Sequence, residues 1–185
     1  MYNKIGDGMK IIKNSLTNEL NLRVEENFPV KGVDFIDINP LIIQKETLKE
    51  IVDKFISEIK DRNIDYIVGP EARGFIFGSV VAYKLNIGFI PVRKKGKLPP
   101  TTVESIFEYE KEYGKDILEL PKLVNNGYNG KNFYVIDDIY ATGNTIRSIK
   151  ENIEQLGGNV VGIGAVINIV ELNKDNVFSL IEVNE

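Results

Sequence analysis

The sequence predicts a parallel α/β sheet that is covered by helices on both faces. Short apolar runs of strand length alternate along the chain with longer segments whose apolar residues recur every three or four positions. Strands and helices that alternate in this way form βαβ units, which place helices on both faces of a parallel sheet. The chain has 185 residues, 43% of them hydrophobic, so we expect one core and a single domain over residues 1–185.

The clearest helix signal covers residues 45–59. Its apolar residues follow the i, i+3, i+4 spacing of an amphipathic helix: Leu48, Ile51, Val52, Phe55, Ile56 and Ile59. After a polar turn, residues 64–68 read as a buried strand that Gly69 and Pro70 should end.

The later elements follow the same alternation. In order they are a helix at 74–85, a strand at 87–92, a strand at 133–137, a helix with Ile146, Ile149, Ile153 and Leu156 on one face, and a strand at 160–170. Residues 1–28 form an N-terminal arm in which Leu16, Leu20 and Val24 indicate a short helix.

The composition restricts the chemistry that the chain can perform. It has no Cys and no His, so acid–base work must fall to Asp, Glu, Lys or Tyr, and any metal should be a hard ion such as Mg²⁺. A net charge of −4 argues against a nucleic-acid partner. No apolar stretch reaches the roughly 18–20 residues of a membrane span, and the first residues lack the apolar core of a signal peptide. We therefore expect a cytoplasmic protein without a membrane partner.

The most specific feature of the sequence is the 137–145 segment. Two carboxylates, a small hydroxyl-rich turn and a helix start follow one another there: Asp137, Asp138, Ala141, Thr142, Gly143, Asn144 and Thr145. Backbone N–H groups at a helix start form an anion site, and the two acids could hold vicinal hydroxyls beside that anion. The pattern predicts a sugar phosphate as ligand. The alternative is that the acids cap the turn and Thr145 caps the helix.

Two further loops carry positive charge directly after predicted strands. The 69–74 loop reads Gly-Pro-Glu-Ala-Arg-Gly, and the planar fork of its Arg73 suits a diphosphate. The 93–100 cluster is the densest run of positive charge in the chain, although a lysine-rich run can also be plain solvated surface. Carboxyl ends of parallel strands meet at one sheet edge, so we expect all three loops to converge there.

A polar stretch from about residue 94 to 116 follows. It contains Gly96, two prolines and many charges, which predicts a mobile hood that closes over a ligand and excludes water. Glu112 lies near its returning end.

These segments together resemble the type I phosphoribosyltransferases. In that family a loop similar to the 137–145 segment binds phosphoribosyl pyrophosphate (PRPP): its two acids hold the ribose 2′ and 3′ hydroxyls and its turn cradles the 5′-phosphate. Four further segments are similar to the adenine phosphoribosyltransferases and follow that family's order, namely residues 32–38, 71–78, 93–99 and 112–116. The resemblance covers roughly residues 28–170.

The resemblance implies the type I phosphoribosyltransferase fold and an enzyme of purine salvage. Its substrates would be PRPP and adenine, and its products AMP and pyrophosphate. It also implies Mg²⁺ as cofactor, held mainly by PRPP and water rather than by protein ligands, and a homodimer.

Roles at the base follow from the same resemblance. Phe35 would stack on the purine while the backbone at Asp34 and Ile36 reads its edge. Glu112 would be the acid/base group near N7.

Roles at the pyrophosphate follow likewise. Glu71, Ala72 and Arg73, together with Lys97, would hold this leaving group. Arg93 would reach the pyrophosphate in a neighbouring subunit.

Among the departures from the family pattern, three concern predicted site residues. Ile36 stands where members often carry Arg or Lys, and Asp34 where they often carry a neutral residue. Asn144 replaces a frequent second Gly, which the loop should tolerate because Asn also accepts φ > 0. Two alternatives stay open: transfer to hypoxanthine, guanine or xanthine, and a non-catalytic PRPP-sensing regulator. The regulator should bring a DNA- or RNA-binding surface, which this acidic chain lacks.

Overall fold

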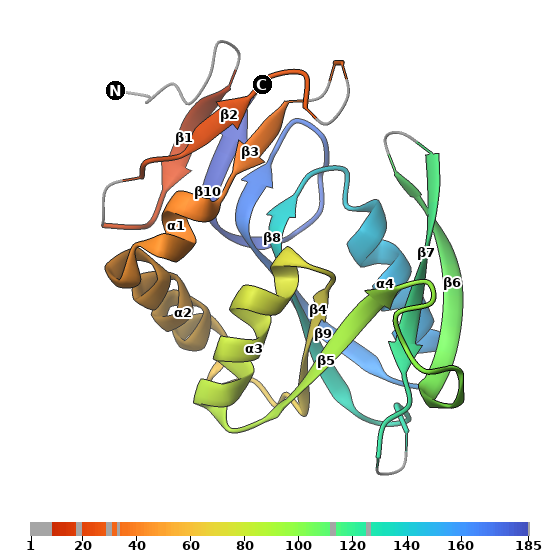
Figure 1. Ribbon diagram of the computed structural model, residues 1–185. Coiled ribbons are helices and arrows are strands. Elements are labelled where there is room, and N and C mark those ends of the chain that lie inside the picture. The colour runs from red at the N-terminus through yellow and green to blue at the C-terminus, as the bar shows by residue number, and fades with distance from the viewer. Residues whose placement is uncertain are drawn as a thin grey trace.

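An eight-stranded mixed sheet forms the centre of the molecule (Figure 1). The computed structural model describes residues 9–17, 20–28, 31–32, 34–111, 114–124 and 127–184. In chain order its elements are β1 (Lys10–Asn14), β2 (Arg23–Glu25), β3 (Phe35–Asp37), α1 (Asn39–Ile43), α2 (Lys45–Ile59), β4 (Tyr66–Pro70), α3 (Arg73–Leu85), β5 (Gly88–Lys94), a 3₁₀ turn (Pro100–Thr102), β6 (Val103–Lys111), β7 (Gly114–Pro121), β8 (Asn132–Tyr140), α4 (Asn144–Gln155), β9 (Asn159–Ile169) and β10 (Phe178–Asn184).

The strands of this sheet lie in the order β1-β10-β9-β8-β4-β5-β7-β6. The five strands from β10 to β5 run parallel to one another, which confirms the predicted α/β class. Antiparallel strands, which the sequence did not predict, extend both edges: β1 beside β10, and the β6–β7 hairpin beside β5. A separate two-stranded sheet pairs β2 with β3.

Two apolar cores lie on opposite faces of the sheet. Because successive side chains of a strand point to opposite faces, Ile67 and Val68 of β4 enter different cores. The helices α2 and α3 cover one face, where Phe55 and Phe77 are fully buried. Helix α4 covers the other face through Ile149 and its neighbours. None of the helices within the described ranges is both long and apolar enough to cross a membrane.

The helix at residues 45–59 has the bounds that its periodicity predicts. The strand expected at 64–68 is instead β4, which contains Gly69 and Pro70 rather than ending before them. Pro70 is the last residue of that strand, where a missing N–H costs the ladder little.

The helix predicted in the N-terminal arm is wrong. The described residues of this arm form β1 and β2 and no helix. Ser15 donates to the carbonyl of Leu180 through both its N–H (2.9 Å) and its Oγ (2.8 Å). Leu16 and Leu22 are buried in the core that α2 covers. The pairing of β1 with β10 and of β2 with β3 therefore overrides the local helical spacing.

Candidate active site at the carboxyl edge of the parallel strands

The three loops predicted to bind anions leave adjacent parallel strands at one edge of the sheet (Figure 1). The 137–145 segment ends β8, the 69–74 loop ends β4, and the 93–100 cluster ends β5. β4 lies between the other two strands, so the predicted convergence is confirmed. Ligands of α/β sheets bind beyond this edge.

Both acids of the 137–145 segment lie within β8, which continues to Tyr140 rather than ending at Asp137 as expected. Asp137 lines a cavity of about 270 Å³. Asp138 is buried, and its Oδ2 lies 2.7 Å from Nε of Arg73. This ion pair lacks hydrogen-bond geometry, so Asp138 Oδ2 keeps its acceptor capacity within the described part of the chain.

The 137–145 segment supplies most of the wall of this cavity. The lining residues are Glu110, Asp137, Ile139, Tyr140, Ala141, Thr142, Gly143, Asn144, Thr145 and Ile146. Gly143 has a φ of +80°, and a Cβ there would lie 2.3 Å from Oη of Tyr140 and 2.7 Å from Nη1 of Arg147. Only glycine can adopt this φ without strain and fit into the space beside Tyr140 and Arg147. The first residues of α4, Asn144 to Ile146, also line the cavity, so it lies at the N-terminus of this helix.

The structure corrects two expectations at this helix start. Asn144 is the first residue of α4, and the only non-glycine residues with positive φ in the described chain are Asn27 and Asn86. The second Gly is thus dispensable because Asn144 is helical, not because Asn tolerates φ > 0. The alternative cap is also absent: Gly143 is the N-cap of α4 and no side-chain hydrogen bond caps it, so Thr145 stays available to a ligand.

Asp137 has an unusual electrostatic environment for a carboxylate. Desolvation raises its pKa well above the ordinary value, and the neighbouring Asp138 carboxylate raises it further. The N–H of Asp138 donates to Asp137 Oδ1 at 2.9 Å, and this contact lowers the pKa, as does the charge of Arg73. Burial and the neighbouring Asp138 therefore disfavour the charged form of the Asp137 carboxylate, which lines the cavity.

Arg73 joins the acids to the strand predicted to bind a base. Its guanidinium lies over the ring of Phe35, with 4.8 Å between Cζ and the ring centroid. Its Nη1 donates a long hydrogen bond of 3.5 Å to the carbonyl of Ile36. With the Asp138 ion pair, one side chain at the start of α3 contacts both β3 and β8.

The two departures in β3 differ in position. The Ile36 side chain is 2% exposed and packs in the core, so only its backbone can contribute to a site. Asp34 is exposed. Phe35 is half-buried, and its ring makes an edge contact with Phe28 at 5.3 Å between centroids. The ring and the backbone of β3, not the side chain of Ile36, therefore face the site.

The 69–74 loop and the 93–100 cluster are tied together by Glu71. Its Oε2 accepts from Nε of Arg93 and from the N–H of Lys94, both at 3.0 Å. The Lys94 N–H, and to a smaller extent Arg93, lowers the pKa of Glu71 below its ordinary value although burial opposes this. The Glu71–Ala72 peptide bond is cis. Lys97 is exposed.

Glu119 of β7 is a site residue that the sequence analysis missed. It is 4% exposed, and its two oxygens accept from the N–H groups of Gly96 (2.8 Å) and Leu98 (3.3 Å). This carboxylate therefore fixes the backbone of the 93–100 cluster. One signal was present: a single acid within the apolar run at residues 117–120.

The predicted acid/base residue Glu112 lies outside the described residues. Much of the stretch predicted as a hood is ordered as the β6–β7 hairpin, which joins the main sheet through β5. Glu110, two residues before Glu112, lines the 270 Å³ cavity. The hairpin thus reaches the candidate site, and its mobility stays a prediction.

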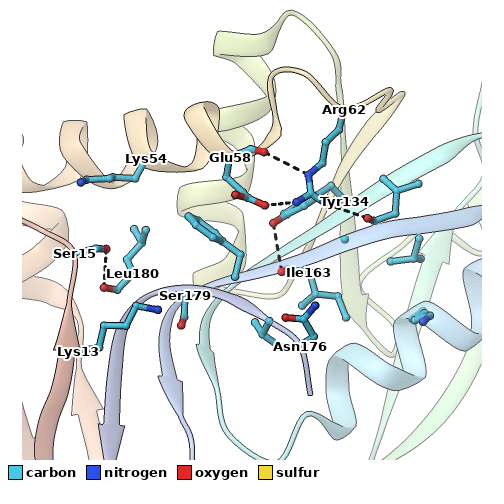
Figure 2. A pocket seen from close by; sticks show the side chains of 16 residues that line it. Lys13, Ser15, Lys54, Glu58, Arg62, Tyr134, Ile163, Asn176, Ser179 and Leu180 are labelled. Atoms are coloured by element: carbon cyan, nitrogen blue, oxygen red, sulfur yellow. Dashed lines mark hydrogen bonds and ion pairs between the residues drawn. The ribbon is translucent and has the colours of Figure 1, made fainter. Parts of the chain in front are cut away.

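A second cavity, of about 580 Å³, lies at the opposite, amino edge of the strands (Figure 2). One of its cations, Arg62, is paired with Glu58 and lies over the ring of Tyr134. Another, Lys13, pairs with Glu182. None of the predicted site residues lines this cavity, so the carboxyl edge is the candidate active site.

Comparison with known proteins agrees with this geometry. Residues 41–182 match the model of the phosphoribosyl transferase domain. An adenine phosphoribosyltransferase of Clostridium acetobutylicum is 50% identical over 153 residues, which cover 83% of this chain and 87% of the relative.

Solved structures agree as well. That of an adenine phosphoribosyltransferase from Thermoanaerobacter pseudethanolicus matches with a TM-score of 0.79 and 36% identity, over 87% of this chain and 95% of the other. The Saccharomyces cerevisiae enzyme, in complex with an imino-altritol bisphosphate and adenine, matches with a TM-score of 0.75 and 37% identity, over 86% and 93% of the two chains. The chain therefore belongs to the phosphoribosyl transferase family and, within it, to the adenine phosphoribosyltransferases.

Proposed function

We propose that the chain transfers the 5-phosphoribosyl group of PRPP to N9 of adenine, giving AMP and pyrophosphate in purine salvage. The observation that carries this proposal is the convergence of an anion-binding helix start, two carboxylates and an aromatic ring at one sheet edge. Arg73 contacts both Asp138 and Phe35, so the places for ribose and base adjoin.

The 137–145 segment binds the donor in this proposal. Thr142, Gly143 and Thr145 donate to the 5′-phosphate through N–H and hydroxyl groups at the start of α4. Asp137 and Asp138 accept from the ribose 2′ and 3′ hydroxyls. Ala141 and Asn144 complete the turn.

The base binds on β3. The purine stacks on Phe35, and the backbone of Asp34 and Ile36 reads its edge. Arg73 covers one face of the Phe35 ring, and we propose that its guanidinium turns to the pyrophosphate when the substrates bind. Glu112 acts on the proton near N7 and would add about 10²–10⁴-fold to the rate.

The leaving pyrophosphate is held by the 69–74 loop, with Arg73 and the backbone of Glu71 and Ala72, and by Lys97. Displacement at the anomeric carbon passes through an oxocarbenium-like state, so stabilising the departing diphosphate is the main catalytic task.

Mg²⁺ enters with PRPP in this proposal. The described residues contain no group of three or more acids that could hold a metal ion. The ion would be held mainly by the diphosphate of PRPP and by water, which supply the oxygen ligands that Mg²⁺ prefers. The bound ion would neutralise charge on the leaving group. We further propose a cytoplasmic homodimer in which Arg93 reaches the neighbouring site.

Loop variants test the donor site. Asp138→Asn and Thr142→Val each remove a hydrogen bond worth about 1.5–3 kcal/mol when charge-assisted, so the KM for PRPP should rise about tenfold or more. The KM for adenine should change less. Asp53→Asn, on the exposed face of α2, is the control. An unchanged PRPP affinity in both loop variants would overturn the assignment of this site.

Base selectivity tests the acceptor. Adenine presents an amine donor beside an N1 acceptor, whereas 6-oxopurines present an acceptor beside an N1–H donor. A backbone N–H and C=O pair on β3 should therefore prefer adenine by at least ~10²-fold in kcat/KM, about 2.7 kcal/mol. Guanine turnover equal to adenine turnover would contradict the choice of base and leave the PRPP chemistry standing.

A further inference from the structure

We infer that Asn173, Arg147 and Asp175 are positioning residues that hold the backbone of the 137–145 segment in its anion-binding orientation. The inference rests on the proposed PRPP site and assigns it a support from outside the segment. Asn173 and Asp175 belong to the connection between β9 and β10, and Arg147 belongs to the first turn of α4.

Two successive carbonyls of the segment are held by these side chains. Asn173 Nδ2 donates to the carbonyl of Ala141 at 2.8 Å, and Arg147 Nη2 donates to the carbonyl of Thr142 at 2.6 Å. Both peptide bonds are trans, and in a trans peptide the N–H points opposite to the C=O. Fixing these two carbonyls therefore directs the N–H groups of Thr142 and Gly143 away from the two donors.

The donors are not among the residues that line the 270 Å³ cavity. Thr142 and Gly143 line the 270 Å³ cavity, whereas Asn173, Arg147 and Asp175 do not. Directed away from the donors, the two N–H groups face the volume proposed for the 5′-phosphate. Successive N–H groups aimed at one point form an anion-binding nest.

Each positioning residue is itself fixed. Asp175 Oδ2 accepts from Nη1 of Arg147 at 2.5 Å and from Oη of the buried Tyr140 at 2.6 Å. Arg147 also donates to Oδ1 of Asn144 at 2.8 Å. Asn173 shares its amide hydrogens between Ala141, Oδ1 of Asn168 (2.9 Å) and the carbonyl of Ile169 (3.0 Å), all in contact range.

Geometry rather than charge is the contribution of Arg147. A cation in the first turn of a helix opposes the helix dipole, and here the Asp175 carboxylate compensates it. Its planar fork holds three acceptors from two nitrogen atoms in a fixed geometry, whereas a lysine offers all its donors from one nitrogen atom. Gly143 packs directly against this fork, because a Cβ there would lie 2.7 Å from Nη1.

The test uses variants that keep the charge or the shape of a positioning side chain but lose its hydrogen bond to the backbone of the 137–145 segment. Arg147→Lys keeps the positive charge and loses the fork, and Asn173→Asp keeps the shape and replaces the donor with an acceptor. Lys150→Gln, one turn further along α4, is the control for charge alone. Steady-state kinetics gives KM for PRPP, KM for adenine and kcat, and ¹⁵N amide shifts of Thr142 and Gly143 are followed on titration with ribose 5-phosphate.

We expect Arg147→Lys and Asn173→Asp, the two clamp variants, each to raise the KM for PRPP about five- to tenfold, which is the effect of one lost hydrogen bond. The kcat of both should change less than about twofold. The KM for adenine and all parameters of Lys150→Gln should stay unchanged. The amides of Thr142 and Gly143 should shift in both clamp variants before any ligand is added.

Two results would overturn the inference. One is an Arg147→Lys protein with wild-type PRPP kinetics and wild-type amide shifts. The other is a Lys150→Gln protein whose KM for PRPP rises as much as that of the clamp variants, because the rise would then follow from a change of charge on α4 and not from the lost contacts. If Asp138→Asn and Thr142→Val raise the KM for PRPP and the clamp variants do not, the positioning role fails while the proposed site stands. If none of the four does, the site itself is wrong.

Discussion

Asp137 and Asp138 are consecutive residues of β8 with opposite surroundings. Asp137 lines the cavity, whereas Asp138 is buried and paired with Arg73. The guanidinium compensates Asp138, whereas desolvation and the charge of Asp138 raise the pKa of Asp137. A ligand that donates hydroxyl hydrogens to Asp137 would relieve this penalty, which is a reason to keep an unfavourable carboxylate there.

The raised pKa of Asp137 predicts how pH changes stability. An acid whose pKa is higher in the folded chain than in the unfolded chain lowers the free energy of unfolding as pH rises from the unfolded value, about 4, through the folded value. Below the unfolded value the penalty is absent. Asp137→Asn should therefore be more stable than the wild type at pH 7, and this difference should shrink toward pH 3.

Urea denaturation at several pH values measures this difference. Asp53→Asn is the matched control, because it removes an acid from an exposed ion pair on α2 and should cost a little stability at pH 7 instead. An Asp137→Asn protein that is less stable than the wild type at pH 7 would contradict the prediction. PRPP binding should be weakened in this variant regardless of stability.

At the scale of elements, the β6–β7 hairpin holds the 93–100 cluster through Glu119. Glu119→Ala leaves the N–H groups of Gly96 and Leu98 without their acceptor, a cost of about 1–3 kcal/mol. Local opening should rise accordingly, so trypsin should cleave after the lysines of residues 94–97 about tenfold faster. Glu108→Ala on β6 removes only an exposed pair with Lys115 and should not change the rate. Equal cleavage of both variants would show that Glu119 does not fix the cluster.

Elements whose burial repeats with one period could be predicted from the sequence. The apolar face of residues 45–59 packs on the sheet and gives α2 its predicted bounds. The arm could not be predicted, because the spacing of Leu16, Leu20 and Val24 imitates a helix while the pairing of β1 with β10 and of β2 with β3 decides the structure. Strand ends were also missed: the acids of a ligand site look like a loop, yet β8 continues through them to Tyr140.

In the candidate site too, some residues could be predicted from the sequence and others could not. Residues in contiguous strings, such as the 137–145 segment, were predicted because each string has a local pattern that suits one ligand group. Glu119, Asn173 and Asp175 were not, since the site residues that they contact lie 21 to 35 residues away in the chain. Such contacts exist only once the sheet has brought strand ends together.

For the whole molecule, the open question is whether a site is completed within one chain. Within this chain Arg93 pairs with Glu71 at 3.0 Å and lies over the ring of Phe75, with 5.8 Å between Cζ and the centroid. The proposed role of Arg93 instead places it at the pyrophosphate of a neighbouring subunit. Both positions are next to the 69–74 loop, so only a mixed assembly can separate them.

Mixing two defective chains makes that separation. Arg93→Ala and Asp138→Asn should each be weakly active alone. If Arg93 acts across a twofold interface, a mixed dimer has one site with both Asp138 from its own chain and Arg93 from the other, and one site that lacks both. Random pairing of equal amounts makes half the dimers mixed, so about a quarter of all sites should regain wild-type activity.

The two chains are refolded together or coexpressed, and kcat per site is compared with that of the unmixed variants. If Arg93 serves its own chain, every site carries one defect and mixing restores nothing. Activity equal to the mean of the two unmixed proteins, in a sample shown by tagged purification to contain mixed dimers, would therefore assign Arg93 to the site of its own subunit.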